Sequence, residues 1–375
     1  MRQSRVLSHN QTAFLALVRA GLWETEVRLP AVDIDCPELF RLAQEQAVVG
    51  LVAAGLEHVP EAEVAKKDAL AFVGNALQLE QRNAAMNHFI GGLVERMRAA
   101  GILAVLVKGQ GVAQCYARPL WRACGDVDFL LDEENYAKAK RFLIPLAASV
   151  DHEGAYGKHQ GMSIDGWTVE LHGNLRGGIS SRMDRVLEEV QESVFAGGDV
   201  RSWRDGETEV LLPGADADVL FVFTHFLKHF YKGGIGLRQI CDWCRVLWTF
   251  RDTLDVGLLE ARLRAMGVVS EWRAFGAFAV EYLGMPVAAM PLYSPARKWS
   301  RKAEGICSFV MKVGNFGHNR DLSYFSKRPY LVRKVISMGW RIADACRHVR
   351  IFPLDSLRFL PRIVLNGLSG AARGE

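Results

Sequence analysis

The feature that most constrains this chain is a pair of aspartates inside an apolar run. The stretch "GDVDFLL" covers Gly125 to Leu131. Side chains alternate along a strand, so Asp126 and Asp128 share one face while Val127 lies on the other. Burial of an unpaired carboxylate is unfavourable by several kcal/mol, and two carboxylates on one face also repel each other. The pattern therefore predicts that something positively charged lies against this strand.

A second strand is expected to bring a third carboxylate to the same place. The segment from Trp167 to His172 alternates cleanly, so Glu170 and His172 share one face. Neighbouring strands lie about 4.8 Å apart. If the two strands pair, the carboxylates of Asp126, Asp128 and Glu170 converge. Oxygen ligands of this kind suit Mg²⁺ or Mn²⁺, and two such ions about 3.5–4 Å apart support in-line phosphoryl or nucleotidyl transfer.

Two roles are open for His172. It could orient the acceptor or accept a proton, or it could be a structural neighbour that hydrogen-bonds a carboxylate. Lys158 and His159 precede the same region and could reach the site, but the pattern does not give their orientation.

Residues between the two acidic strands suggest contacts with phosphate. Residues 103–107 form a short β-rich run, and Lys108-Gly109 follows it directly. A glycine at such a turn lets the backbone approach a phosphate closely. Arg118 and Arg122 lie before the acidic strand, and a guanidinium group binds phosphate in bidentate fashion. We therefore predict that this segment binds a nucleoside triphosphate (NTP).

The rest of the chain is expected to be mainly helical. Helices are predicted from Pro37 to about Glu57 and from about Glu61 to Ala100, the second with Leu70 and Leu77 among its apolar positions. The helical pattern returns at Pro213 and continues almost to the end. The predicted fold class is α+β, with a helical region at 1–100, a mixed-sheet core at 101–212 and a helical region at 213–375.

Composition bears on location. Half of the residues are hydrophobic, but no segment has the roughly 20 mostly apolar residues that span a membrane. Seven cysteines, an odd number without framework spacing, are typical of a reducing compartment. We therefore expect a cytoplasmic protein without a transmembrane segment.

The C-terminal end is basic. From Ser326 to Glu375 there are ten Lys or Arg residues against three Asp or Glu residues. Such a tail could contact an anionic partner, which would be nucleic acid, a lipid surface or an acidic protein, or it could be a solvated helical surface. The solvated surface is favoured, and nucleic acid is disfavoured as a partner.

Four segments together resemble a known family. They are "LVKGQGVAQCY", "RACGDVDFLL", "VELHGNL" and "HFLKHFYKGGIGLRQICDW", and they resemble the bacterial family of uncharacterised nucleotidyltransferases, in the superfamily with a DNA polymerase β-like fold. The resemblance covers about Leu103 to Leu247. It implies transfer of a nucleoside monophosphate from an NTP to an acceptor hydroxyl or phosphate, with pyrophosphate leaving. This chain has Gly109-Gln110 where the superfamily usually has Gly-Ser or Gly-Gly, although Gln110 can still donate to a phosphate.

The resemblance also implies that a C-terminal helical segment packs against the catalytic centre. Its polar residues would be His225, His229, Arg238 and Asp242. Three readings are open for the histidines, which are four residues apart and share a helix face. They could face the substrate, bind zinc with Cys241 and Cys244, or make ordinary packing contacts, the cysteines then being small buried hydrophobes.

Three functions remain open from the sequence. The leading one is an enzyme whose acceptor is a small molecule, a sugar, a protein side chain or an RNA end. The others are a non-catalytic nucleotide-binding protein and a zinc-stapled helical interaction protein. The presence of all three carboxylates, Asp126, Asp128 and Glu170, favours the enzyme.

Overall fold

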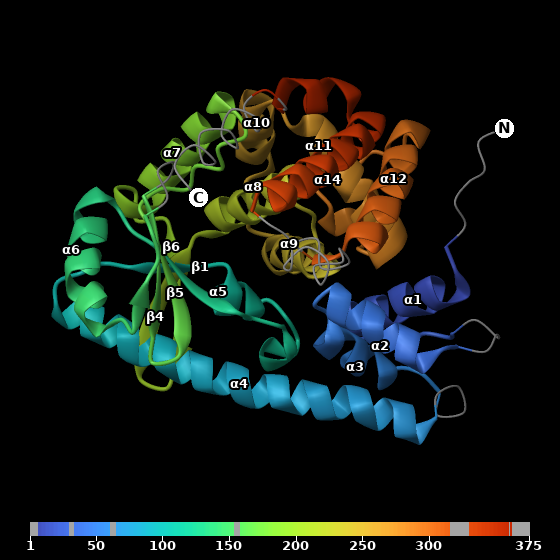
Figure 1. Cartoon of the computed structure of the whole chain (residues 1–375), viewed down its shortest axis with the longest axis horizontal. Helices are drawn as coiled ribbons and strands as arrows, with labels where there is room; N and C mark the ends of the chain where they lie inside the picture. Colours follow the sequence, from blue (N-terminus) through green and yellow to red (C-terminus); the bar gives the residue numbers. More distant parts are fainter. Residues whose placement is uncertain are drawn as a thin grey trace.

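A small mixed sheet lies at one end of a largely helical molecule (Figure 1). The computed structural model describes residues 7–29, 34–60, 65–153, 158–315, 330–359 and 361. The N-terminal region contains the helices α1 (His9–Trp23), α2 (Cys36–Glu45), α3 (Val49–Leu56) and α4 (Lys66–Ala99). The C-terminal region contains α8 (Ala215–Lys232), α9 (Leu237–Phe250), α10 (Val256–Met266), α11 (Val269–Leu283), α12 (Arg297–Val313) and α14 (Tyr330–Ile351).

The central sheet has five strands in the order β1-β2-β5-β4-β3. Its strands are β1 (Val105–Val107), β2 (Asp126–Leu130), β3 (Ser149–Val150), β4 (His159–Ile164) and β5 (Trp167–His172). The pair β2–β5 is parallel and the other pairs are antiparallel, which confirms the predicted mixed sheet. The connections include α5 (Gly109–Ala113), the 3₁₀ turn η2 (Pro119–Trp121) and α6 (Glu133–Leu143).

Two elements of this region were not expected from the sequence. The helix α7 (Ser181–Phe195) follows the sheet, and a separate hairpin, β6 (Val200–Asp205) with β7 (Thr208–Pro213), comes after it.

The two faces of the sheet belong to different cores. Val127 and Phe129 of β2 pack into a core that also contains Ile90 of α4 and Ala139 of α6. Leu130, which points the other way, belongs to a larger core formed mainly by the N-terminal and C-terminal helices. The face that carries Asp126 and Asp128 is therefore turned toward the helices, and α8 and α9 cover it.

The predicted helix from Pro37 to Glu57 is two helices, because the chain breaks after α2. Gln46 lies at the break and its side chain is fully buried. Its amide nitrogen donates to Val310 O at 3.0 Å, and its amide oxygen accepts from Leu237 N at 2.9 Å. These bonds join the N-terminal helices to α9 and α12, which a continuous helix could not do in this way.

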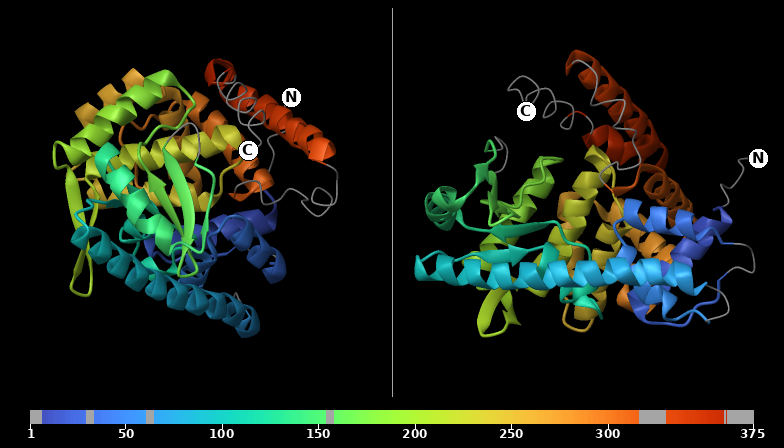
Figure 2. Two further views of the ribbon diagram at one scale, coloured as in Figure 1. Left: turned by 60° about the vertical axis from the view of Figure 1, so that its left-hand side comes forward. Right: turned by 60° about the horizontal axis from the view of Figure 1, so that its bottom comes forward.

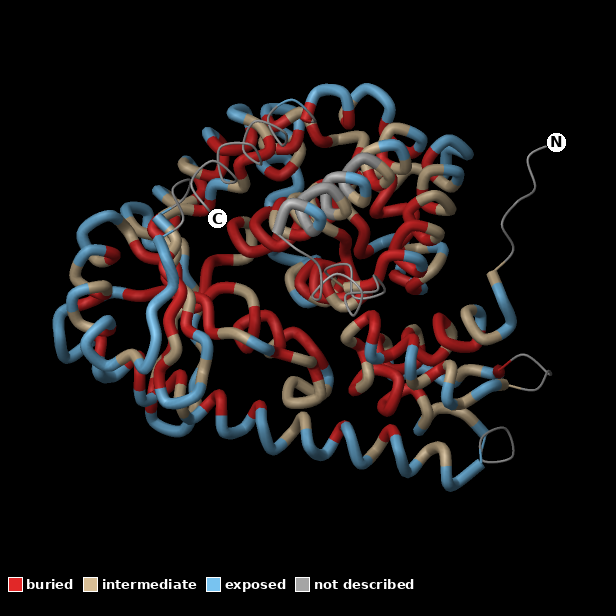
Figure 3. The backbone as a smooth tube through the Cα atoms, in the orientation of Figure 1, coloured by how far each residue is buried: buried red, intermediate tan, exposed pale blue. Residues whose placement is uncertain are grey.

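Helix α4 runs along one side of the molecule, beneath both the N-terminal helices and the sheet (Figures 1 and 2). The helix was predicted, but its buried face was predicted only in part: Ile90, one of the expected apolar positions, is fully buried. Leu70 and Leu77 are 69% and 48% exposed, whereas Phe72 and Ala76 are buried against the N-terminal helices. Figure 3 shows the mixture of buried and exposed positions along this helix. Helix α4 contacts the N-terminal helices with one face and the sheet region with another. A single apolar stripe along the helix therefore does not predict which of its residues are buried.

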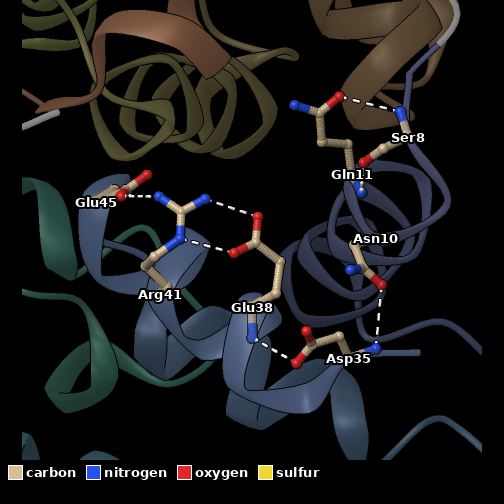
Figure 4. Close-up of polar contacts among 7 residues, drawn as sticks. All are labelled: Ser8, Asn10, Gln11, Asp35, Glu38, Arg41 and Glu45. Carbon is tan, nitrogen blue, oxygen red and sulfur yellow. Dashed lines mark hydrogen bonds and ion pairs between the residues drawn. The ribbon is translucent and has the colours of Figure 1, made fainter.

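Local polar contacts define the start of α2 (Figure 4). Asp35 caps the helix by accepting from Glu38 N at 3.1 Å, and its own backbone N–H donates to Asn10 of α1 at 3.1 Å. Arg41 lies between Glu38 and Glu45 and pairs with both. Surface pairs of this kind contribute only about 0–1 kcal/mol each, so packing holds these helices in place.

The described part of the basic tail packs on the helical region. A second helix at 353–359 follows α14, and Phe352 and Phe359 belong to the larger core. Arg347 pairs with Asp344 at 2.6 Å, and Arg358 donates to Gly267 O at 3.3 Å. Much of the tail lies outside the described residues, so contact with an anionic partner stays a prediction. Across the residues that the structure describes, no helix combines the length and apolar character needed to cross a membrane.

Candidate active site

Three carboxylates meet on the helix-facing side of the sheet. Asp128 and Glu170 are direct partners in the parallel pairing of β2 with β5, and Asp126 lies two residues before Asp128 on the same face. One oxygen from each of the three lies within 4.8 Å of the others. The geometry is the one expected from the alternation in the two strands.

Lys108 supplies the positive charge that these carboxylates require. Its Nζ lies 2.6 Å from Asp128 Oδ1, and the two side chains are only 14% and 2% exposed. Burial lowers the pKa of Lys108, but the charge and hydrogen bond of Asp128, together with the charges of Asp126 and Glu170, raise it, so the net shift is upward. Lys108 precedes α5 with a φ of 57°, a left-handed conformation that is uncommon for a residue with a side chain.

Two histidines contact the carboxylates. His172 Nε2 lies 2.7 Å from Asp128 Oδ1 and 3.5 Å from Glu170 Oε2, while His159 Nε2 lies 3.0 Å from the same oxygen of Glu170. These hydrogen bonds hold the pKa of Glu170 well below its usual range. The pKa of Asp126 is raised, first by the charge of Asp128 and then by burial.

His172 thus makes the carboxylate contact that was one of its two predicted roles. The sequence left open whether His159 reaches the site. The antiparallel pairing of His159 with His172 brings it there, and the sequence pattern did not give that register.

A cavity of about 500 Å³ opens beside the carboxylates, between the sheet and the helices. Its walls include Gly109, residues 122–125, Asp126 and Asp128. From the helical side, α8 and α9 contribute Phe226 and Arg238. Pockets of this size commonly hold a nucleotide-sized ligand.

Three residues that line this cavity carry a buried polar atom with no hydrogen-bond partner among the described residues. Arg122, Arg238 and Asn315 line the cavity. Arg122 Nη1, Arg238 Nε and Asn315 Oδ1 are buried and lack a hydrogen-bond partner. Buried polar groups are normally satisfied. The two arginine nitrogens are donors that suit an anionic ligand, and the Asn315 oxygen is an acceptor that suits a donor group such as a hydroxyl or an amine. Asn315 follows α12, far from any recognisable motif, and no sequence signal could have identified it.

Asp242 of α9 anchors the segment that precedes β2. It accepts two hydrogen bonds from Arg122, at 3.0 Å and 2.6 Å, and one from the Tyr116 hydroxyl at 2.8 Å. Arg238 of the same helix donates to Ala123 O at 2.7 Å. The predicted polar residues of α9 therefore position this segment, and Arg122 and Arg238 also line the cavity.

Arg118 and Gln110 lie outside this cavity, although both were predicted to contact the triphosphate. Arg118 forms a bidentate pair with Glu57, at 2.6 Å and 2.5 Å, and its guanidinium group lies over the Trp121 ring. Gln110 is 1% exposed and its amide points toward Met86. The N-terminal helices thus hold Arg118 away from the carboxylates, and we leave both residues out of the proposed site.

The histidines of α8 lie beside each other. His225 and His229 are 3.1 Å apart through their Nε2 atoms, and His225 also lines the cavity. Burial, with the charge of Lys108, lowers the pKa of His225 well below its usual value. Burial, with the charge of Lys228, lowers that of His229 to about 3. Both are therefore neutral at physiological pH.

The zinc reading of this helix pair finds no support. Cys241 and Cys244 are fully buried in the larger core. Among the described residues, neither belongs to a group of three or more side chains that could hold a metal ion. The cysteines are small core residues.

The carboxylate group, in contrast, is a suitable metal site. It offers three hard oxygen ligands, and the raised pKa of Asp126 reflects repulsion that a cation would relieve. A second group, His159, Glu170 and His172, lies directly beside it.

Comparison with known proteins agrees with this site. A family model described as "Uncharacterised nucleotidyltransferase" matches residues 32–284. That range includes the sheet, the carboxylates and helices α8 and α9. No curated protein matches the chain, and no solved structure matches it either.

Proposed function

The chain belongs to the uncharacterised nucleotidyltransferase family, and on that premise we propose that it moves a nucleoside monophosphate from an NTP to an acceptor with the help of a divalent metal. The acceptor supplies a hydroxyl or phosphate oxygen, and pyrophosphate leaves. The observation that carries the proposal is that Asp126, Asp128 and Glu170 meet beside a nucleotide-sized cavity, which Asp126 and Asp128 line.

The cavity of about 500 Å³ beside the carboxylates is the proposed NTP site. Gly109 has a φ of 41°, a conformation that glycine adopts without strain and that brings the backbone close to a ligand. Arg122 and Arg238 line the same cavity with buried nitrogens that lack partners among the described residues, and Lys108 reaches its edge. These groups would neutralise the triphosphate and orient its α-phosphate toward the carboxylates.

Asp126, Asp128 and Glu170 would hold Mg²⁺ or Mn²⁺, which when bound lowers the pKa of an attacking hydroxyl and offsets charge on the phosphate. The low pKa of Glu170 keeps it a carboxylate, which suits a ligand and not a group that stores a proton. The acceptor oxygen forms a bond to the α-phosphorus, the bond to the bridging oxygen breaks, and pyrophosphate departs with that electron pair. The hydroxyl proton passes to water.

The test is a screen with the four α-³²P-labelled NTPs, Mg²⁺ or Mn²⁺, and fractions of a cell extract. Label should enter one fraction with one preferred NTP, and pyrophosphate should appear in equal amount. EDTA should abolish the transfer. The absence of transfer with every NTP and metal, together with tight NTP binding, would favour the non-catalytic alternative.

A further inference from the structure

A second, smaller cavity lies on the other side of Lys108 and His225. It measures about 40 Å³, which is room for about three water-sized groups and matches the size of a single phosphate or carboxylate. Its wall contains His172, the residue that contacts Asp128 and Glu170. His172 of β5 therefore connects this cavity to the carboxylates, although none of the three lines it.

Three cationic side chains contribute to the lining of this cavity. Lys108, Arg176 and Lys228 all contribute to it. Lys108 already pairs with Asp128, and Arg176 contacts Glu188 at the rim. No ion pair joins Lys228 to a carboxylate among the described residues. Burial, followed by the charges of Lys232 and Lys108, lowers the pKa of Lys228 to about 8. Lys228 is thus a largely buried cation held beside other cations.

The wall opposite α8 is firmly built. Residues 174–177 contribute to it, and Asp184 fixes the end of this loop by accepting from Gly177 N at 3.0 Å and Gly178 N at 3.1 Å. Lys232 donates to Gly177 O at 3.0 Å, which joins this loop to the end of α8. The folded chain thus holds repelling charges around a small cavity, an arrangement that an anion would relieve.

We infer that this second cavity binds an anionic group of the acceptor, and this inference rests on the proposed function. The acceptor is then a phosphorylated or carboxylated molecule. The two cavities divide the reaction: the NTP occupies the larger one, and the acceptor enters past His172. An anion held by Lys228 and Arg176 would place a neighbouring hydroxyl near Glu170, next to the α-phosphate. A neutral acceptor would leave Lys228 without an ion-pair partner among the described residues, with the charges of Glu170 and Asp128 acting on it only from further away.

The probe is inorganic phosphate, titrated at pH 7 by calorimetry into metal-free wild type and into Lys228→Met. Methionine keeps the length of the side chain and removes its charge. The matched control is Lys138→Met, which removes a lysine charge from the surface of α6, where it pairs with Glu134. Phosphate affinity should fall tenfold or more in Lys228→Met and stay unchanged in Lys138→Met. Lys228→Arg, which keeps the charge, should retain most of the affinity.

A second titration separates this inference from the proposed function. Phosphate is added to protein saturated with Mg²⁺ and an equimolar mixture of the four α,β-methylene NTPs. Phosphate should still bind, because the two cavities are distinct. Displacement of phosphate by the analogues, or equal phosphate affinity in wild type and Lys228→Met, would overturn the inference. Failure of every analogue to bind would count against the proposed function, while the metal-free titration would still test the phosphate site.

Should Lys228→Met not fold, Arg176→Gln provides the same comparison. The Arg176 side chain is 51% exposed, so its replacement does not disturb the core. It should weaken phosphate binding several-fold, and unchanged binding would contradict the inference.

Discussion

Lys108 explains how three carboxylates can lie together before any cation binds. Its ammonium group makes an ion pair with Asp128 on the side where the metal is proposed to bind. The sequence pattern predicted that a positive charge must lie there, and it identified Asp126, Asp128 and Glu170 from side-chain alternation alone. It could not predict which residue would supply the charge, because the conformation of the turn at Lys108 decides that.

Loop residues show the limit of prediction at this scale. Arg118 and Arg122 are four residues apart in the same loop, and both looked suited to phosphate. Arg122 faces α9 and the cavity, whereas Arg118 turns to Glu57 of the N-terminal region. Local sequence does not specify the partner of a loop side chain when the partner comes from a distant segment.

Replacement of Asp128 by asparagine should abolish most of the activity. The change keeps the shape of the side chain but removes a metal-binding charge, so turnover should fall by about 100-fold or more. The sequence pattern alone predicts relief of carboxylate repulsion. The structure instead predicts a loss of about 1–3 kcal/mol in unfolding free energy, because Lys108 loses its partner.

The control for this variant is Asp165→Asn. Asp165 lies in the exposed turn between β4 and β5 with a φ of 49°, which asparagine tolerates. Turnover and urea unfolding are measured for both variants and wild type. Full turnover in Asp128→Asn would contradict the metal site.

Two arginine variants should show which arginine contributes to NTP binding. Arg238→Gln removes a guanidinium group that lines the cavity and should weaken NTP binding about tenfold, or about 1.4 kcal/mol. Arg118→Gln should leave NTP binding unchanged and reduce the unfolding free energy by no more than about 1 kcal/mol, because its ion pair is partly exposed. Equilibrium dialysis with the preferred NTP measures the binding by each variant, and urea unfolding measures the stability of Arg118→Gln. If NTP binding weakened in Arg118→Gln and not in Arg238→Gln, then Arg118 would belong to the NTP site and Arg238 would not.

At the scale of elements, close helix contacts hold the structure around the site. A Cβ on Gly50 of α3 would lie 1.9 Å from Trp121 O in η2, the turn that leads into Arg122. This contact, like the break at Gln46, joins the N-terminal helices to the catalytic region. Helical periodicity predicted that these helices exist. It could not predict which helices approach each other closely, because contacts between backbones do not affect the pattern of hydrophobic residues.

Gly50→Ala should therefore destabilise the protein by several kcal/mol and displace the turn before β2. The matched control is Gly74→Ala in α4, where an added Cβ meets nothing within 4 Å. That variant should gain about 0.5–1 kcal/mol, since alanine favours the helix over glycine. Urea unfolding of the two variants gives the comparison. Equal stability of both would show that α3 can move away from η2 without loss.

At the scale of the whole molecule, a buried acid makes stability depend on pH. Glu271 of α11 is fully buried and accepts from the Tyr231 hydroxyl at 3.0 Å. Burial, with the charge of Asp355, raises its pKa from about 4.5 to about 8. Between these values the folded chain keeps a proton that the unfolded chain has lost, so stability falls as pH rises through this range and then levels off.

Glu271→Gln should remove this dependence. Relative to the variant, wild type should lose on the order of a few kcal/mol of unfolding free energy between pH 5 and pH 8. Urea unfolding at pH 5, 6, 7 and 8 measures the difference. Parallel stability curves for the two proteins would mean that Glu271 is ionised in the folded chain.

The larger core joins regions that the sequence pattern divided at 100 and 212. It runs from Ala13 of α1 to Phe359 beyond α14, and it includes Val105 of β1 and Leu130 of β2. The face of the sheet that carries the carboxylates is thus completed by the flanking helices. The change from helical to strand periodicity marks where the elements change, but it does not say whether each region can bury its own apolar surface.

A fragment of residues 101–212 should therefore fail to fold alone, although it contains all three carboxylates. It would expose Val105, Leu130 and Met183, which pack into the larger core in the whole chain, and Asp242 would no longer hold Arg122. The expected result is poor amide dispersion in a ¹H–¹⁵N spectrum and no cooperative thermal transition, whereas the full chain melts cooperatively. A fragment that unfolds cooperatively and binds Mg²⁺–NTP would show that the flanking helices shape only the acceptor side, and the site would then be a property of the sheet alone.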